Sequence, residues 1–346
     1  MKVFSGIPRD DLGKIPDRAA WIETMGYDGI NTNEDFSSPF MALTMAAEHT
    51  HKALLGTSIA VVFPLSPMNV AYMSWELQKY SHGRFQLGMG SQVKGHIERR
   101  FSTPWVAPGP RMKEYVLSLK AIWDSFQNGT PLDFQGEFYN FSLITPHFNP
   151  GPIDFPPPKI FIAAVGPYMF RLAGEHCDGV LPHGFMTKKY MDEVALPNLE
   201  KGLQRSGRTL KDIEISAGGM LVMGEDEEEL GTAYTEAKRR IAFYGSTRTY
   251  KVVMDVHGWG EVCLELNRLA SAGRWDDMPA MITDEMVEAF ATIGTYDQII
   301  GKIKSRFAGY ATQIGFSIPA HDPNGEDRLK QKIRDCLLYT SDAADE

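Results

Sequence analysis

Short apolar runs rich in β-branched residues alternate along the chain with longer segments whose apolar residues recur every three or four positions. This alternation is typical of strand–helix units and predicts a parallel sheet covered by helices. Eight such units in sequence favour an α/β fold of the (β/α)8 TIM barrel type over an open, doubly wound sheet. The strand candidates are residues 2–6, 28–32, 54–63, 84–88, 159–164, 178–182, 213–223 and 312–318.

Two helices have clear boundaries in the sequence. We expect one over residues 16–25, ended by Gly26, because glycine readily adopts the left-handed conformation that closes a helix. We expect another over residues 67–80, which begins with a proline. Proline suits the first turn of a helix, where its missing N–H would have no partner in any case.

Three segments are too long to be simple loops of a barrel, and we interpret them as insertions. They are residues 91–110, 129–158 and 245–294. The second contains LDFQGEFYNFSL, which predicts a β-hairpin with Gln135 and Gly136 near its turn. Because no linker divides the composition, we expect residues 1–335 to form one domain with insertions.

Composition excludes several classes of protein. Of the 346 residues 43% are hydrophobic and 23% charged, which is enough apolar material for a large core. A formal charge of −9 opposes a nucleic-acid partner, because such binding needs clustered Lys and Arg. Charges within the first ten residues, and the lack of an apolar run of about 18 residues, predict neither a signal peptide nor a membrane span. We therefore expect a cytoplasmic protein.

The three cysteines, Cys177, Cys263 and Cys336, show no CxxC spacing, so neither a disulfide framework nor a metal site is predicted. The last eleven residues, CLLYTSDAADE (336–346), do not continue the preceding helical pattern. They resemble the translation of a transposase adapter used in DNA sequencing, and we give them no functional role.

In barrels of this type the active site lies at the carboxyl ends of the strands. Polar residues gather at the end of the second strand candidate, where the stretch NTNEDF holds Asn31, Asn33, Glu34 and Asp35, and His183 follows the sixth. The fifth ends in AAVGP, where a helix beginning at Pro167 would present free amides and a positive dipole end to an anion. The residues alone favour a phosphate site and a ligand-free tight turn about equally.

The fourth strand candidate ends in the glycine-rich stretch GMGSQV. Gly88 and Gly90 lack the third glycine of a dinucleotide fingerprint, and no Gly-Lys-Ser/Thr follows, so this is neither a Rossmann motif nor a P-loop. It does indicate a backbone that a ligand can approach closely.

Two long blocks resemble the luciferase-like monooxygenase superfamily. LGTSIAVVFPLSPMNVAYMSWELQKYSHGRFQLGMGSQ is similar to the third and fourth strands of that superfamily, and IFIAAVGPYMFRLAGEHCDGVLPHG to its fifth and sixth. The stretches SPMNVAYMSWELQ and GSQVKGHIERRFSTPW resemble most closely the branch that depends on the deazaflavin coenzyme F420. The resemblance implies a (β/α)8 barrel, commonly a homodimer, which binds F420 or FMN at its carboxyl face.

The resemblance also implies roles for individual residues. It places a non-prolyl cis peptide at Ser58–Ile59, beneath the central ring of the cofactor. The cofactor-binding candidates that follow from it are Asn33, Ser58, Ile59, Gly90, Ser91, Gln92, Ala164, Val165, Gly166 and Pro167. Glu34 and Asp35 fall where the family places polar residues near the ring and the substrate.

The leading functional hypothesis is hydride transfer between F420 and a small organic substrate, with one side chain moving a proton. The catalytic candidates are His96, Glu34, Asp35 and His183. Two alternatives stay open for the histidines: His96 as a surface helix residue, and His183 as the partner of a backbone group. Two alternatives stay open for the function: an FMN-dependent monooxygenase, and a non-catalytic deazaflavin-binding protein.

Overall fold

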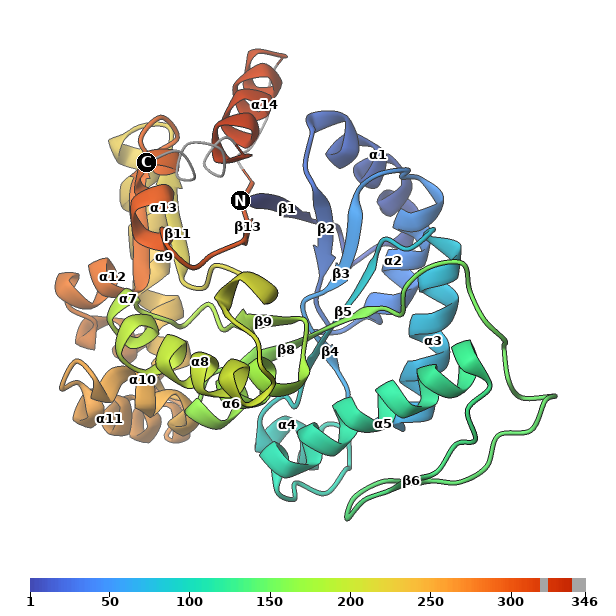
Figure 1. Cartoon of the computed structure of the whole chain (residues 1–346). Coiled ribbons are helices and arrows are strands. Elements are labelled where there is room, and N and C mark those ends of the chain that lie inside the picture. Colours follow the sequence, from blue (N-terminus) through green and yellow to red (C-terminus); the bar gives the residue numbers. More distant parts are fainter. Residues whose placement is uncertain (318–322, 338–346) are drawn as a thin grey trace.

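A closed parallel barrel forms the centre of the molecule in the computed structural model, which describes residues 1–317 and 323–337 (Figure 1). Its sheet has the order β10-β9-β8-β5-β3-β2-β1-β13, and a bridge between Ser216 and Gln313 joins the two ends. This confirms the predicted (β/α)8 barrel. The strands are β1 (Lys2–Gly6), β2 (Gly29–Thr32), β3 (Leu54–Thr57), β5 (Phe85–Gly90), β8 (Lys159–Ala164), β9 (Gly179–Pro182), β10 (Glu214–Ile215) and β13 (Gln313–Gly315).

Helices pack around the outside of the barrel, and two of them match their predicted ranges closely. α1 (Ile15–Met25) ends at Gly26, whose φ of 91° is left-handed, and α3 is Pro67–Tyr80 as expected. The other helices of the outer layer are α2 (Pro39–Glu48), α5 (Pro108–Asn128), α6 (Pro167–His176), α8 (Leu196–Arg205), α13 (Ile299–Phe307) and α14 (Pro323–Leu337). Figure 1 shows α1, α2 and α3 on one side of the barrel and the C-terminal helices on the other.

The predicted insertions carry structure of their own. The second holds the expected antiparallel hairpin, β6 (Phe134–Gln135) with β7 (Asn140–Phe141). The first contains the short α4 (Lys94–Arg99). The third is mostly helical, and with α9 (Glu227–Gly245) before it contributes α10 (Lys251–Asp255), α11 (Gly260–Ser271) and α12 (Asp284–Phe290).

Inside the barrel, two phenylalanine rings occupy the space beside glycines of the neighbouring strands. The ring of Phe4 lies where a side chain on Gly29 of the neighbouring strand would be, and the ring of Phe161 does the same over Gly179. Below them Glu214 accepts hydrogen bonds from Lys2 at 2.8 Å and Lys159 at 2.6 Å. The base of the barrel is thus closed by an ion network and its middle by two rings, which leaves the carboxyl end as the accessible mouth.

The prediction of one strand over residues 213–223 is wrong, because these residues contribute to two separate strands. Its first part is the barrel strand β10, but its second part is β11 (Met220–Gly224), which pairs with β12 (Ala291–Thr295) in a separate two-stranded sheet. The chain turns between the two at Gly219, whose φ is 98°. β12 lies within the third insertion, where no strand was expected.

Two other predicted boundaries also differ. The third run, 54–63, is interrupted after Thr57 and resumes as β4 (Ala60–Val61), which pairs with β5. At the C-terminal end, α14 continues through Leu337 and buries Cys336, two residues beyond the expected boundary. Residues 318 and 338–346, which belong to the last strand candidate and to the adapter-like tail, lie outside the described residues.

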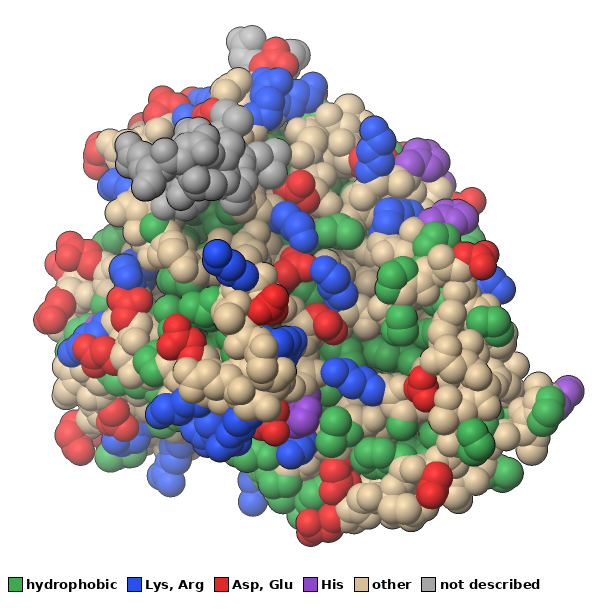
Figure 2. Space-filling view, in the orientation of Figure 1, with side chains coloured by type: hydrophobic (Ala, Val, Ile, Leu, Met, Phe, Trp, Pro, Cys, Tyr) green, Lys and Arg blue, Asp and Glu red, His purple; other side chains and the backbone are tan. Residues whose placement is uncertain are grey.

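Most buried apolar side chains between Met1 and Cys336 belong to one hydrophobic cluster among the described residues. The extension of one domain over 1–335 stays a prediction. On the face in Figure 2, acidic and basic side chains are interspersed. Within the described part of the chain, no helix combines the length and the apolar character needed to cross a membrane.

Candidate active site

The break between β3 and β4 is held in place by both neighbouring strands. The Ser58–Ile59 peptide is cis, as the resemblance implied. The Ser58 N–H donates to the Thr32 carbonyl of β2 at 2.7 Å. On the other side, the Thr57 hydroxyl donates to the Gly88 carbonyl at 2.7 Å and accepts from the Gly88 N–H at 2.9 Å. A side-chain hydroxyl therefore replaces the backbone ladder where β3 ends.

Glu34 is tied to the same break and is the half-buried carboxyl group of the site. Its N–H donates to the Ile59 carbonyl at 3.1 Å, and its Oε2 accepts from the Val61 N–H at 2.8 Å. Burial raises the pKa of Glu34, although the Val61 hydrogen bond and the charge of Arg100 act in the opposite direction. A carboxyl with a raised pKa at a strand end is suited to proton transfer.

Asp35, by contrast, is exposed and already paired. Its carboxylate forms a salt bridge with Arg9, and it accepts a hydrogen bond from the Asn33 amide at 2.8 Å. The Arg100 guanidinium donates to the Asp35 carbonyl. The candidates Asn33 and Asp35 thus join the loops after β1 and β2 to the end of α4, at the rim of the mouth.

Gly90 is the last residue of β5, and Ser91 and Gln92 begin the loop that follows it. Gly90 is buried, and a side chain there would meet Ile59 Cδ1 at 2.6 Å, so the broken segment rests directly on this glycine. Gln92 has a left-handed φ of 57°, and its Oε1 accepts from the Val93 N–H at 3.0 Å. The Ser91 hydroxyl donates to the Gln92 carbonyl at 3.0 Å. The Gln92 side chain is therefore turned onto its own loop.

α6 begins beside this loop and has no side-chain cap. Its N-cap residue is Gly166, with extended φ of −81° and ψ of 160°, and Pro167 opens the helix. A Cβ on Gly166 would meet no other atom within 4 Å. β8 neighbours β5, and Ala163 Cβ lies 3.4 Å from the Cβ position of Gly90. The free helix start and the end of β5 therefore face one region of the mouth, where a helix dipole favours an anion.

Ala164 and Val165 contribute through their backbone. The buried Ala164 accepts a hydrogen bond from the His183 N–H at 3.2 Å. The Val165 carbonyl accepts from the Tyr190 hydroxyl at 2.8 Å. These bonds fix the direction in which the chain enters α6.

His183 follows β9 and has partners at both ring nitrogens. Nδ1 accepts from the Phe185 N–H at 3.0 Å, so the proton of the neutral ring is assigned to Nε2, which lies 3.2 Å from the Tyr250 hydroxyl. The two rings stack with centroids 4.6 Å apart. Burial lowers the pKa of His183 to about 4, and Arg240 contributes in the same direction. His183 satisfies a backbone group, which was the alternative interpretation.

We expect His183 to make the protein sensitive to acid. A histidine with a lowered pKa in the folded state binds its proton more readily when unfolded, so stability falls as pH drops from about 6.5 to about 4. The difference between these two pKa values corresponds to a loss of at most about 3 kcal/mol in the free energy of unfolding. His183→Asn keeps an acceptor for the Phe185 N–H but cannot be protonated. Urea unfolding at pH 7 and pH 4.5 should show a smaller acid-induced loss in the variant; an equal loss would contradict the assignment.

His96 lies elsewhere. It is an exposed residue of α4, and its carbonyl accepts the helix-ending bond from the Arg100 N–H at 2.9 Å. This is the surface-helix alternative. The four catalytic candidates therefore do not form one cluster: Glu34 is at the β3–β4 break, Asp35 and His96 are exposed, and His183 is fixed in an aromatic group.

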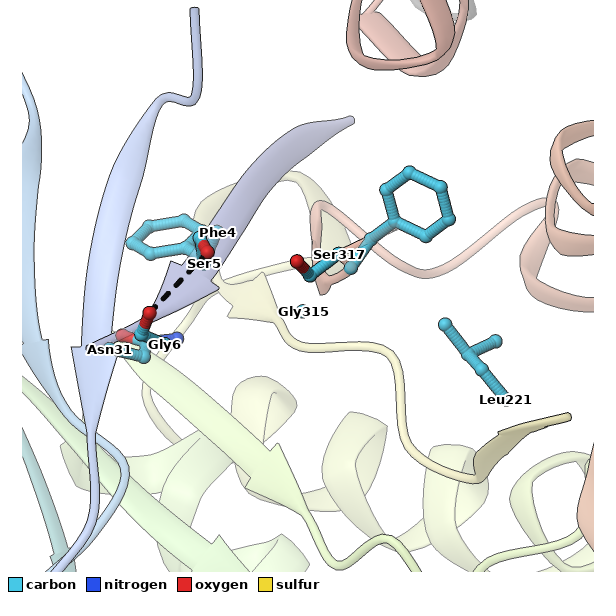
Figure 3. A pocket seen from close by; sticks show the side chains of 8 residues that line it. Phe4, Ser5, Gly6, Asn31, Leu221, Gly315 and Ser317 are labelled. Atoms are coloured by element: carbon cyan, nitrogen blue, oxygen red, sulfur yellow. Dashed lines mark hydrogen bonds between the residues drawn. The ribbon is translucent and has the colours of Figure 1, made fainter. Parts of the chain in front are cut away.

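A cavity of about 270 Å³ opens on the other side of the barrel mouth (Figure 3). It lies at the ends of β1, β2 and β13, and Leu221 of β11 closes it. Its lining residues are Phe4, Ser5, Gly6, Asn31, Leu221, Gly315, Phe316 and Ser317. Of these, only Asn31 belongs to the polar stretch noted at the end of the second strand candidate, and none was predicted to bind coenzyme or to be catalytic. The rule that strand ends carry the site would have pointed to Gly6 and Phe316 had it been applied to the first and last strands.

Tyr250 was also missed, because it comes from the third insertion, whose position relative to the barrel no local pattern reveals. Burial raises the pKa of Tyr250 to about 12, so its hydroxyl stays protonated. Among the described residues, no group of three or more His, Cys, Asp or Glu side chains is placed to hold a metal ion. The three cysteines are free and buried.

We compared the chain with protein families and with known proteins. The family model described as luciferase-like monooxygenase matches residues 3–313. An uncharacterized protein of Mycobacterium tuberculosis is 45% identical over 314 residues, 91% of this chain and 92% of that protein. The 5,10-methylenetetrahydromethanopterin reductase of Archaeoglobus fulgidus is 29% identical over 311 residues, 88% of this chain and 87% of that protein.

The fold is also that of a solved structure. The coenzyme F420-dependent tetrahydromethanopterin reductase from Methanopyrus kandleri matches with a TM-score of 0.75 and 22% identity, over 98% of this chain and 99% of that one. At this identity the likeness supports the fold, and the function has to be argued from the site.

Proposed function

Since the chain belongs to the luciferase-like monooxygenase family, we propose that it is an oxidoreductase that transfers a hydride between coenzyme F420 and a small organic substrate. The observation that carries the proposal is the uncapped start of α6 beside the end of β5, across the mouth from an unassigned cavity. F420 is favoured over FMN because the stretches SPMNVAYMSWELQ and GSQVKGHIERRFSTPW resemble the F420-dependent branch of the family.

The residues present fit such a coenzyme. An anionic phosphate is suited to the start of α6, because Gly166 carries no side chain that would block it and the dipole of the helix is positive at this end. Ser91 offers a hydroxyl at the neighbouring strand end. Ile59, resting on Gly90, provides an apolar surface for a ring. When bound, the deazaflavin supplies the hydride chemistry, and the protein supplies binding, orientation and proton transfer.

Glu34 is our candidate for the proton transfer. Its raised pKa leaves it closer to neutral pH than an ordinary carboxyl, and its backbone and side chain are both attached to the Ile59–Val61 segment. His183 has both nitrogens occupied, and Asp35 is neutralised by Arg9. The homodimer and the cytoplasmic location stay predictions and belong to the same proposal.

Substitution of Gly166 tests the coenzyme site. Asp and Asn are both good N-cap residues, and the φ and ψ of Gly166 suit a cap, so both variants should be at least as stable as the wild type. Gly166→Asp places a negative charge where the phosphate is proposed to bind, whereas Gly166→Asn has the same shape without the charge. We expect F420 affinity, measured by fluorescence quenching, to fall at least about tenfold more for Asp than for Asn.

The same titration with FMN distinguishes the alternatives. Copurification of FMN, with no quenching of added F420, would contradict F420 dependence and favour a flavin monooxygenase. Tight F420 binding without any change at its 420-nanometre absorbance, over a screen of hydride donors, would favour a non-catalytic binding protein. Equal F420 affinities of the Asp and Asn variants would contradict a phosphate site at the start of α6.

A further inference from the structure

We propose that the cavity at the ends of β1, β2 and β13 receives the substrate, that this substrate is a neutral hydroxyl or carbonyl compound, and that Asn31 determines its specificity. The proposal rests on the proposed function, because it gives the coenzyme and the substrate opposite sides of one mouth. Figure 3 shows Asn31 at one wall of the cavity and Leu221 at the other.

The position of the cavity follows from the order of the strands. Around the closed barrel, β1 and β13 stand opposite β8 and β5. Apart from Asn33 at the rim, the coenzyme candidates lie at the ends of β3, β5 and β8, and none of the candidates lines the cavity on the β13-β1-β2 side. A substrate placed there would lie across the mouth from the proposed phosphate site, beside β2, the strand that Glu34 follows.

Asn31 points into the barrel mouth because its neighbours are glycines. It stands in register with Gly6 of β1 and Gly56 of β3. Its Oδ1 occupies the place where a side chain on Gly56 would be. The residue is half-buried and lines the cavity, and its amide has no hydrogen-bond partner among the described residues. The amide can therefore bond a ligand that enters the cavity.

The lining indicates the class of ligand. Phe4, Leu221 and Phe316 are apolar, the polar atoms come from Asn31 and two serines, and no lining residue is ionisable. A charged group would lose hydration without gaining a counter-charge, whereas a hydroxyl or carbonyl needs only hydrogen bonds. The Asn31 amide can accept from a hydroxyl through Oδ1 and donate to a carbonyl through Nδ2, so it can bind either compound.

A matched set of cyclohexane compounds tests the proposal on the full chain. Cyclohexanol and cyclohexanone are the neutral probes, and cyclohexanecarboxylate is the charged control with the same ring. Crystals grown with and without F420 are soaked in each probe, and affinities are measured in solution by ligand-observed NMR. We expect the neutral probes in the cavity with their oxygen bonded to Asn31, and an affinity at least about tenfold weaker for the carboxylate.

Two variants remove the site from different sides. Asn31→Leu replaces the amide with an apolar group of similar size, and Leu221→Trp fills the cavity from β11 without changing Asn31. Both should weaken cyclohexanol binding at least about tenfold while F420 quenching stays within about twofold of the wild type. Thermal unfolding checks that each variant is folded. If Asn31→Leu does not fold, Leu221→Trp still tests the proposal.

Several outcomes would overturn the inference: no neutral probe in the cavity, equal binding of the carboxylate, or a coenzyme ring that itself occupies the cavity and contacts Asn31. A loss of F420 binding in Asn31→Leu would likewise make Asn31 a coenzyme residue. If F420 does not bind the wild type but cyclohexanol still occupies the cavity, the proposed function fails and the cavity remains a site for neutral ligands.

Discussion

Gly88→Ala is expected to destabilise the fold by about 3 kcal/mol or more, which is enough to unfold many proteins of ordinary stability. A Cβ at this position would overlap the Thr57 carbonyl oxygen and come within 2.8 Å of Leu181 Cδ1. The first of these neighbours is backbone and cannot rotate away. Thr57 is also the residue whose hydroxyl joins β3 to β5, so the clash falls where the ladder has no other support.

Gly166→Ala is the matched control, because it makes the same chemical change at a neighbouring strand end with open space around it. Its φ of −81° is ordinary for alanine, so we expect unfolding within about 0.5 kcal/mol of the wild type. Urea unfolding followed by circular dichroism measures both. A stable Gly88→Ala protein would mean that β3 and β5 can separate, and the description of the β3–β4 break would then be wrong.

The barrel could be predicted because each strand carries its own signal. β8 and β9 are short, apolar and bounded by turn residues. Among the helices, α2, α3, α5 and α6 begin at prolines, and α1 and α5 end at glycines. The seventh strand could not be predicted in the same way. The segment 213–223 is interrupted at Gly218 and Gly219, but the local pattern does not tell which of two sheets each half joins. β12 was missed because its partner, β11, is distant in the sequence.

The candidate site, like the fold, could be predicted from the sequence only in part. The ends of β2, β5 and β8 were found because the barrel rule and the family resemblance both point to them. Asn31 and Asn33 look alike in the stretch NTN, yet only Asn31 lines the cavity. Asn31 stands in β2 in register with two glycines, whereas Asn33 lies in the loop that follows. Tyr250 reaches His183 from an insertion. Such contacts arise from tertiary packing, which a single sequence does not display.

Glu34→Gln is expected to reduce turnover by a factor of about 10² to 10⁴, the usual contribution of a positioned acid or base, while F420 affinity changes little. The amide keeps an oxygen to accept from the Val61 N–H, so the β3–β4 break should stay intact. Once a substrate is known, single-turnover absorbance at the 420-nanometre band measures the hydride step. Asp35→Asn is the control: it changes the adjacent, exposed carboxylate and should cost less than about tenfold.

Measuring the stability of Glu34→Gln distinguishes a loss of turnover caused by the missing acid from one caused by misfolding. Burial raises the pKa of Glu34 in the folded state, so the unfolded chain ionises first and wild-type stability declines as pH rises above the ordinary value of 4.5 towards the raised one. Gln cannot ionise, and the variant should therefore be as stable as the wild type at pH 4 and equally or more stable at pH 7. An inactive variant with that profile has lost a proton carrier. A variant that is active, or one that is destabilised at pH 7, would show that Glu34 supports the fold instead.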